Sequence, residues 1–341
     1  MTIEALEIVL PGIVDPEGLQ ITRRQLAAPG PGQVSVRMEA TGVSFAEQQM
    51  RRGKYYDQPA FPFVPGYDLV GTVIEVGTGV DPALVGGRFA ALTKTGGWAS
   101  AVLLDAADLI PVPTGIDPAE AEAVLVNGVT AWQMLHRVAQ VRSGATILVH
   151  GANGGVGSTL VQLARNAGIT VIGTASARHQ DTVRALGATP IDYRDPDVPA
   201  RVRELAPAGV DAVFDHVGGP GIADSYRLLA RGGTLVSYGS ASTRDDPGAS
   251  RVPVLKLLAR VLLWNALPNG KGAHFYNLWA GLRRRDTFRA KLRTDLAQVF
   301  HQITSGTLAP QVAARIPLQD AATAVRLAES GTVTGKVVLV P

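Results

Sequence analysis

The stretch TILVHGANGGVGSTLVQLARNAG, residues 146–168, joins an apolar run to a helix-patterned segment through a glycine-rich turn. The first N–H groups of a helix have no partner within it and lie at the positive end of its dipole, so such a turn suits an anion. Gly154 lets a pyrophosphate approach the backbone, Gly157 permits close helix–strand packing, and Ala152 takes the place of the first glycine in G-x-G-x-x-G. In this setting the motif predicts a dinucleotide site rather than only a tight turn. Its predicted contacts are Ala152, Asn153, Gly154, Gly155, Val156 and Gly157.

Strand and helix patterns alternate on the C-terminal side of this turn. Further strands are predicted at 170–175, 189–193, 211–217 and 234–239, with helices near 178–186, 197–205 and 221–230. This spacing is typical of a parallel sheet with right-handed crossovers, a doubly wound α/β domain. The cofactor is expected at its carboxyl edge.

The end of the strand at 170–175 distinguishes NAD from NADP, because an acidic residue there would bind the ribose 2′-hydroxyl of NAD. No acid ends this strand; Ser176 and Arg178 follow it instead. Tyr193 and Arg194 follow the next strand and can add a phenol and a second positive charge. Arginine forms charge-assisted bonds to phosphate, so NADPH is the predicted cofactor. Two alternatives stay open: both arginines are ordinary solvated residues, or the nearby Asp181 serves NAD.

The flanking segments predict a second, β-rich lobe. Up to residue 120, short strands are expected at 32–43, 66–80, 86–93 and 96–105, with turn residues between them. A helical segment, 118–139, is expected to break around Asn127-Gly128. Beyond 250 come helices near 252–267, 285–305 and 319–329 and strands at 272–281 and 335–340. The predicted domains are 1–122, 123–281 and a segment 282–341 that returns to the first lobe.

Composition limits the function classes. The 341 residues suit two domains, and 46% hydrophobic with 18% charged residues is typical of a globular protein. The chain contains no cysteine, which excludes disulfides, thiolate nucleophiles and cysteine-based zinc sites. A net charge of +3 argues against a nucleic-acid partner, and the basic run 283–293 is interpreted as a solvated helix face. With no apolar run of about 20 residues and no basic leader, a cytoplasmic protein without membrane contact is expected.

Motifs along nearly the whole chain carry a family resemblance. They are Ala40-Thr41-Gly42-Val43, Pro62-Phe63-Val64-Pro65-Gly66 with Gly71, Gly97-Trp98-Ala99, Asn127-Gly128-Val129-Thr130-Ala131, the glycine-rich turn, Asp215-His216-Val217-Gly218, Gly232-Gly233 with Tyr238-Gly239, and Gly335-Lys336-Val337-Val338. With them the chain resembles the medium-chain dehydrogenase/reductases of the zinc-independent quinone oxidoreductase type. The resemblance implies a GroES-like β-rich catalytic domain and a Rossmann cofactor domain.

The same resemblance shows where zinc ligands would stand in metal-dependent relatives. Ser44 occupies the catalytic cysteine position, Tyr67 replaces the ligand histidine, and the four-cysteine lobe is missing between Thr95 and Pro113. No metal site is therefore expected. Alcohol dehydrogenation needs a stabilised alkoxide, whereas a quinone or enone spreads incoming charge onto its own oxygen. We therefore expect an NADPH-dependent reductase of a quinone or other conjugated carbonyl. The alternatives are an enal or enone double-bond reductase, or a low-turnover NADPH-binding regulatory or nucleic-acid-binding protein.

The resemblance also suggests site residues. Thr130 would lie beside the nicotinamide, unless its hydroxyl only satisfies a helix backbone group. Tyr55 would bind the acceptor oxygen or supply a proton, unless it merely packs, and the adjacent Tyr56 makes this assignment ambiguous. Ser44, Glu47 and Tyr67 would line the same pocket. Further cofactor contacts would come from Asn127, Val217, Gly218, Tyr238, Gly239 and Lys336.

Two further expectations concern His216 and the segment 272–281. His216 is given no catalytic role, because a lone histidine is more often an ordinary neutral hydrogen-bonding residue. The segment 272–281 resembles the edge strand through which relatives pair their cofactor domains. An apolar edge strand needs cover, so a homodimer is expected.

Overall fold

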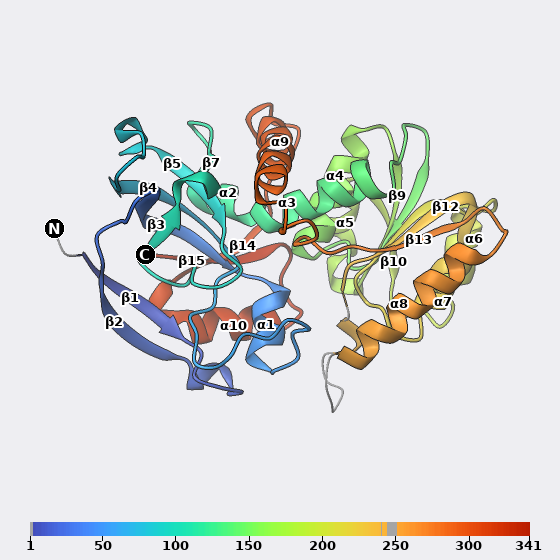
Figure 1. Ribbon diagram of the computed structural model, residues 1–341. Coiled ribbons are helices and arrows are strands. Elements are labelled where there is room, and N and C mark those ends of the chain that lie inside the picture. Colours follow the sequence, from blue (N-terminus) through green and yellow to red (C-terminus); the bar gives the residue numbers. More distant parts are fainter. Residues whose placement is uncertain (1–2, 240, 244–250) are drawn as a thin grey trace. The chain divides into compact units, whose positions relative to one another are not determined.

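The computed structural model describes residues 3–239, 241–243 and 251–341, and for 243 and 251–254 the backbone alone. The chain divides into two compact units (Figure 1). Unit 1 comprises Met1–Val129 and Arg283–Pro341, and unit 2 comprises Thr130–Leu282.

Unit 2 is built on a parallel sheet in the order β10-β9-β8-β11-β12-β13. Its strands are β8 (Thr146–Val149), β9 (Thr170–Ala175), β10 (Ala188–Asp192), β11 (Val210–Asp215), β12 (Leu229–Ser237) and β13 (Gly272–Phe275). Helices lie on both faces (Figure 1): α4 (Gly155–Asn166), α5 (Gln180–Leu186), α6 (Val198–Leu205), α7 (Ile222–Arg227) and α8 (Arg251–Ala266). The predicted doubly wound domain is confirmed. The strand order reverses between β8 and β11, where such sheets bind ligands.

The apolar runs of the central strands follow from burial on both faces. Leu148 of β8, Ile172 of β9 and Val213 of β11 belong to one hydrophobic cluster that continues into Leu235 of β12. β13 forms the sheet edge and is shorter than the predicted strand 272–281. The Asn277 side chain accepts a hydrogen bond from the Trp279 backbone and so starts a turn instead.

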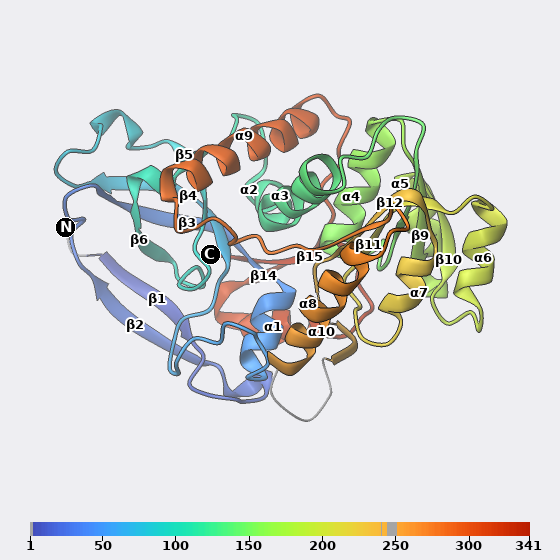
Figure 2. The same cartoon turned by 45° about the vertical axis from the view of Figure 1, so that its right-hand side comes forward.

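Unit 1 contains a sheet in the order β14-β15-β3-β4-β5-β7, with β6 also paired to β3, and a separate pair β1-β2 (Figure 2). The strands are β1 (Ile3–Val9), β2 (Gln20–Leu26), β3 (Gln33–Val43), β4 (Asp68–Val76), β5 (Arg88–Leu92), β6 (Ala101–Asp105), β7 (Ile110–Pro111), β14 (Val312–Pro317) and β15 (Lys336–Val340). The helices are α1 (Phe45–Arg51), α2 (Pro118–Ala123), α9 (Arg285–Thr304) and α10 (Ala321–Glu329). β15 pairs with β3, so the C-terminal segment completes a sheet begun near the N-terminus.

Alternation along β15 decides what packs on each face of this sheet. Val337 and Leu339 join the hydrophobic cluster that contains Val325 of α10. Lys336 points to the other face, where α2 carries Glu122. One face of β15 therefore packs in an apolar core, and the other face carries the charged Lys336 side chain at the first residue of the strand.

The helical segment 118–139 breaks earlier than expected. α2 ends at Ala123, α3 runs over Leu125–Trp132, and a π-helical segment follows over Gln133–Val138. The predicted break at Asn127-Gly128 is therefore wrong. Gly128 is needed for packing instead, because a Cβ there would lie 2.9 Å from Val299 Cγ1 of α9.

The basic run 283–293 is only partly a solvated face. Arg289 of α9 donates to Asp108 at 2.6 Å, and Arg293 donates to the Leu109 carbonyl oxygen at 3.2 Å. These two side chains hold α9 against the segment before β7. No helix within the described ranges is both long enough and apolar enough to cross a bilayer.

Candidate active site

The glycine-rich turn leaves β8 and enters α4 with little space between its two sides. Gly151 has φ +65°, and Gly154 caps the helix with φ −71°. A Cβ at Gly157 would lie 2.2 Å from the Gly151 carbonyl oxygen, so any side chain there would displace the backbone. The structure thus gives Gly157 the packing role that the sequence suggests.

The Ala152 methyl group fits in this turn because the neighbouring strand has a glycine, Gly173, opposite it. Ala152 is fully buried, and its N–H donates to the Thr174 carbonyl oxygen at 2.9 Å. A Cβ at Gly173 of β9 would lie 2.7 Å from the Ala152 Cβ. The departure from the usual glycine is therefore compensated one strand away.

Gly154 is different, because none of the residues that the structure describes requires a glycine there. A Cβ at Gly154 would contact only the Gly151 carbonyl oxygen, at 3.4 Å. The adjacent α4 spans 12 residues and presents its N-terminus at this point. The space beside Gly154 and the dipole of α4 together fit a phosphate group.

A polar network next to the glycine-rich turn was not predicted from the sequence. His150 bonds Thr174 and Ser225 through its two ring nitrogens, at 3.2 and 3.1 Å. Ser225 in turn donates to Asp215 at 2.8 Å. Burial lowers the pKa of His150, so the imidazole is neutral. This network ties β8, β9, β11 and α7 together and fixes the direction in which the chain leaves β8.

Asp215 also organises the loop after β11. Its other carboxylate oxygen accepts hydrogen bonds from the backbone of Val217 and Gly218, at 2.8 and 2.9 Å. The neighbouring end of β12 carries Tyr238 and Gly239, and a Cβ at Gly239 would lie 2.7 Å from the His216 carbonyl oxygen. The structure therefore gathers these predicted contacts at one carboxyl edge.

His216 packs against the same turn. Its Nδ1 lies 3.1 Å from the His150 carbonyl oxygen, and a Cβ at Gly151 would lie 2.3 Å from its ring. Burial lowers the pKa of His216. The contacts are those of a neutral, structural histidine.

The candidate contacts for a 2′-phosphate lie on adjacent strand ends. Ser176 follows β9, and the Tyr193 N–H after β10 donates to the Ala175 carbonyl oxygen at 3.2 Å. Arg178 is exposed, and the Arg194 guanidinium lies 5.6 Å from the centre of the Tyr193 ring. Asp181 pairs with Arg184 at 2.5 Å on the exposed side of α5. This edge thus combines a hydroxyl, a phenol and two cations.

In unit 1, a buried carboxylate joins α1 to the start of β4. Ser44 is the N-cap of α1, and its backbone N–H donates to Glu47 Oε2 at 2.9 Å. The other oxygen, Oε1, accepts from the Tyr67 N–H at 2.7 Å. Glu47 is 2% exposed, and burial, helped by the nearby Asp68, raises its pKa to about 7.

This pKa predicts a pH-dependent stability. Between the usual pKa of 4.5 and about 7, the unfolded chain loses the Glu47 proton while the folded chain keeps it. The folded state then binds more protons, so stability falls as the pH rises through this window, by roughly 2–3 kcal/mol. Urea unfolding at pH 5 and pH 7.5 should show this fall, and Glu47→Gln should reduce it, whereas Glu204→Gln on the exposed side of α6 should not. An unchanged fall in Glu47→Gln would refute the assignment.

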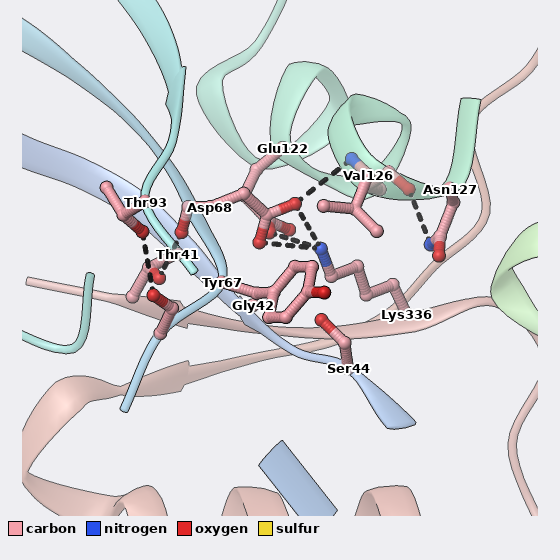
Figure 3. A network of polar contacts seen from close by, with 12 residues as sticks. Thr41, Gly42, Ser44, Tyr67, Asp68, Thr93, Glu122, Val126, Asn127 and Lys336 are labelled. Atoms are coloured by element: carbon pink, nitrogen blue, oxygen red, sulfur yellow. Dashed lines mark hydrogen bonds and ion pairs between the residues drawn. The ribbon is translucent and has the colours of Figure 1, made fainter. Parts of the chain in front are cut away.

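Asp68 and Lys336, whose charges act on Glu47, belong to a buried ion-pair network. Figure 3 shows this network. The Lys336 ammonium contacts Asp68 at 2.9 Å and Glu122 at 2.5 Å, and Asp68 also accepts from the Val126 N–H at 3.1 Å. Burial opposes the charge on Lys336, but the two carboxylates outweigh it and raise its pKa. Burial also raises the pKa of Glu122. The lysine is therefore the counter-ion of an internal acidic pair, and its expected contact with the cofactor stays a prediction.

Gly42 makes room for this network. A Cβ at Gly42 would lie 2.1 Å from Lys336 Cε and 2.3 Å from Glu122 Oε1. The Gly42 carbonyl oxygen also accepts a hydrogen bond from the Trp98 indole at 2.9 Å. Asp68 and Glu122 could have been noticed in the sequence as charges within the apolar runs DLVGTV and AEAVLV.

The residues predicted to bind the substrate or to lie beside the nicotinamide belong to both units. Tyr55 and Tyr67 lie in unit 1 with their hydroxyl oxygens 2.7 Å apart, and the Tyr56 ring packs on Tyr55 with centroids 4.7 Å apart. Asn127 donates to the Ala123 carbonyl oxygen at 2.9 Å. Thr130 belongs to unit 2 and is buried in α3. The structure therefore brings Tyr55, Tyr56 and Tyr67 together, and the role of Thr130 stays a prediction.

The described residues contain no cluster of three or more histidine, aspartate or glutamate side chains arranged to hold a metal ion. Ser44 and Tyr67, at the two ligand positions considered above, are instead parts of the α1 cap and of the tyrosine contact.

Two family models match the chain. One, described as an alcohol dehydrogenase GroES-like domain, matches residues 30–114, and the other, described as a zinc-binding dehydrogenase, matches residues 186–339. A relative named synaptic vesicle membrane protein VAT-1 homolog, from Rattus norvegicus, is 34% identical over 92% of this chain and 78% of its own length.

Solved structures agree with these matches. A quinone oxidoreductase of Pseudomonas syringae pv. tomato superposes with a TM-score of 0.85 at 30% identity, over 99% of this chain and 100% of that one. The quinone oxidoreductase of Escherichia coli, complexed with NADPH, superposes with a TM-score of 0.86 at 27% identity, over 98% and 100%. The GroES-like and Rossmann-type domains expected from the sequence are thereby confirmed. By its motifs, fold and relatives, the chain belongs to the medium-chain dehydrogenase/reductase superfamily.

Proposed function

We propose that this protein is an NADPH-dependent reductase that delivers a hydride to a quinone or another conjugated carbonyl compound without the help of zinc. The observation that carries the proposal is the space beside Gly154 at the N-terminus of α4, in a doubly wound unit similar to that of a quinone oxidoreductase crystallised with NADPH. When bound, reduced NADPH supplies the hydride. The residues of this chain bind it, orient it and stabilise the charge that develops on the acceptor.

The residues present fit this cofactor. The α4 N-terminus would hold the pyrophosphate. The 2′-phosphate would be held beside the ends of β9 and β10 by Ser176, Arg178 and Tyr193. The nicotinamide half would lie at the ends of β11 and β12, in contact with Val217, Gly218, Tyr238 and Gly239.

Zinc independence rests on the chemistry of the replaced ligands. One ligand position holds the helix-capping Ser44 and the other holds Tyr67, whose phenol contacts Tyr55. A serine hydroxyl and a phenol are not the cysteine and histidine that zinc prefers. Conjugated acceptors suit such a site, because their own oxygen takes the charge and hydrogen bonds suffice to stabilise it.

The direct test is NADPH oxidation, followed at 340 nm, with a quinone and an enone in separate assays and with zinc measured in the purified protein. Turnover with either acceptor by zinc-free protein is the expected result, and the preferred acceptor separates a quinone reductase from a double-bond reductase. Stoichiometric zinc, or no NADPH binding, would refute the proposal. Binding without turnover, together with salt-dependent nucleic-acid binding, would favour the regulatory alternative.

Arg178→Ala should reduce the preference for NADPH over NADH. Losing one charge-assisted hydrogen bond to a phosphate costs about 1.5–3 kcal/mol, which is roughly a tenfold to hundredfold change in affinity. Titration of both nucleotides against the variant measures it, with NADH affinity expected to stay the same. Arg184→Ala is the matched control, because Arg184 is paired with Asp181. An unchanged ratio in Arg178→Ala would show that Arg178 is an ordinary solvated residue.

We also propose a cytoplasmic homodimer. β13 is the edge of the parallel sheet, and Ala273 within it is fully buried. The Ala273 N–H and carbonyl oxygen already bond to the Asn265 side chain of α8, both at 2.8 Å, so a second copy would pair with the edge at Phe275. Light scattering at micromolar concentration should give twice the mass of the chain, and replacing Phe275 by proline should halve it. A monomeric wild-type protein would contradict the proposal.

A further inference from the structure

Tyr55 and Tyr67 form a buried phenol pair in unit 1. Their hydroxyl oxygens are 2.7 Å apart, and their rings meet edge to face with centroids 6.4 Å apart. Tyr55 is 8% exposed and Tyr67 is 6% exposed. The Tyr56 ring packs on Tyr55 with centroids 4.7 Å apart, its side chain hydrogen-bonds Tyr55, and it is less buried than Tyr55.

Two separate segments are locked together to form this pair. Tyr55 follows α1, whose C-terminal turn is closed by hydrogen bonds from the Gly53 and Lys54 N–H groups to Met50 and Gln49. Tyr67 immediately precedes β4, and its backbone is bound by Glu47 of the same helix α1. The carboxylate that caps α1 thus also fixes the segment carrying the second phenol.

We propose that Tyr67 is a positioning residue: its hydroxyl donates to the Tyr55 oxygen, which leaves the single Tyr55 hydrogen to be donated to the carbonyl oxygen of the acceptor. Each phenol has one hydrogen, so a hydrogen bond donated by Tyr67 leaves the Tyr55 hydrogen for the acceptor. The Tyr56 side chain, which also hydrogen-bonds Tyr55, can donate to the second lone pair of the Tyr55 oxygen. A hydroxyl that accepts a hydrogen bond is also a stronger donor, because the two bonds polarise each other. The inference rests on the proposed reductase function and specifies how its acceptor is bound.

The chemistry balances with NADPH, the acceptor and water. The hydride forms a C–H bond at the electrophilic carbon, and the displaced π electrons move to the carbonyl oxygen, giving an enolate. With a quinone, this enolate becomes the hydroquinone anion when a proton shifts from the ring carbon to the second oxygen. The Tyr55 hydrogen bond stabilises this oxyanion, and water then supplies the proton and leaves hydroxide. Burial and the neighbouring Tyr67 raise the pKa of Tyr55, so Tyr55 acts as a neutral hydrogen-bond donor rather than as an ionised base.

A double-mutant cycle tests the pair in the full-length protein. Tyr55→Phe, Tyr67→Phe and the double variant keep the rings and lose the hydroxyls, and kcat/KM is measured with NADPH and an enone. We expect kcat/KM to fall about 100-fold in Tyr55→Phe, as for loss of one oxyanion donor, and about 10-fold in Tyr67→Phe. The double variant should equal Tyr55→Phe alone, because Tyr67 acts through Tyr55. NADPH affinity and melting temperature should change little.

The control is Tyr226→Phe, which removes a buried phenol hydroxyl bonded to Asn269 in unit 2. It should leave kcat/KM unchanged. Wild-type activity in Tyr67→Phe, or independent losses that multiply in the double variant, would overturn the positioning role while leaving the reductase function in place. A wild-type protein that reduces no acceptor would overturn the reductase function itself, and this inference with it.

Discussion

Replacing Lys336 with methionine is expected to lower the free energy of unfolding by about 3–5 kcal/mol at pH 8, the usual cost of removing one partner of a buried ion pair. The Lys336 side chain is 2% exposed, and both carboxylates that it contacts, Asp68 and Glu122, are fully buried. Without the ammonium, these two acids face each other with no counter-ion. Urea unfolding monitored by tryptophan fluorescence measures the loss.

The pH dependence separates this explanation from a loss of packing. Protonating a carboxylate relieves the repulsion, so the destabilisation should be clearly smaller at pH 5 than at pH 8. A loss that is the same at both pH values would show that the methylene stem, not the charge, is what matters. Lys256→Met, at an exposed position on α8, is the matched control and should change stability by less than about 0.5 kcal/mol.

Gly154→Val should weaken NADPH binding by roughly 100-fold, or about 2.8 kcal/mol, while the fold is kept. The described residues leave room for a Cβ here, since among them it would approach only the Gly151 carbonyl oxygen, at 3.4 Å. A ligand close to the backbone would meet the added side chain. Isothermal titration calorimetry gives the affinity, and thermal melting shows that the unit is folded.

Gly221→Val, in the same unit, is the control for this experiment, because no described atom lies within 4 Å of a Cβ at Gly221. It should bind NADPH like the wild type. If Gly154→Val also binds NADPH normally, the phosphate does not lie where the turn suggests. In contrast, Gly157→Val is expected to unfold the turn, since its Cβ would lie 2.2 Å from a backbone oxygen.

Local sequence patterns predicted the secondary structure of unit 2 well. The alternating strands and helices from 146 to 239 depend on short-range periodicity, which the sequence displays directly. The glycine-rich turn also has a local cause, the geometry of a strand that leads into a helix. The compensation of Ala152 by Gly173 was not predictable, because it depends on how close two neighbouring strands come.

Long-range pairing was the main limit in unit 1. Glu122 and Lys336 are more than two hundred positions apart, and no local pattern reveals that they meet. The tyrosine pair has the same cause: Tyr55 and Tyr67 are each recognisable as polar aromatics near a turn, but their contact depends on the α1 cap. The expected helix break at Asn127-Gly128 failed because Gly128 serves packing against Val299, which sequence alone does not show.

The position of β15 has a consequence for how the protein is made. β15 lies between β14 and β3, so the sheet of unit 1 lacks an interior strand until residues 336–340 have left the ribosome. Until then, Asp68 and Glu122 also lack their cation. The strands of unit 2 all lie between residues 146 and 275, so unit 2 can acquire its structure first during translation. A nascent chain arrested at residue 330 should therefore protect unit 2 from protease and leave residues 30–114 digestible.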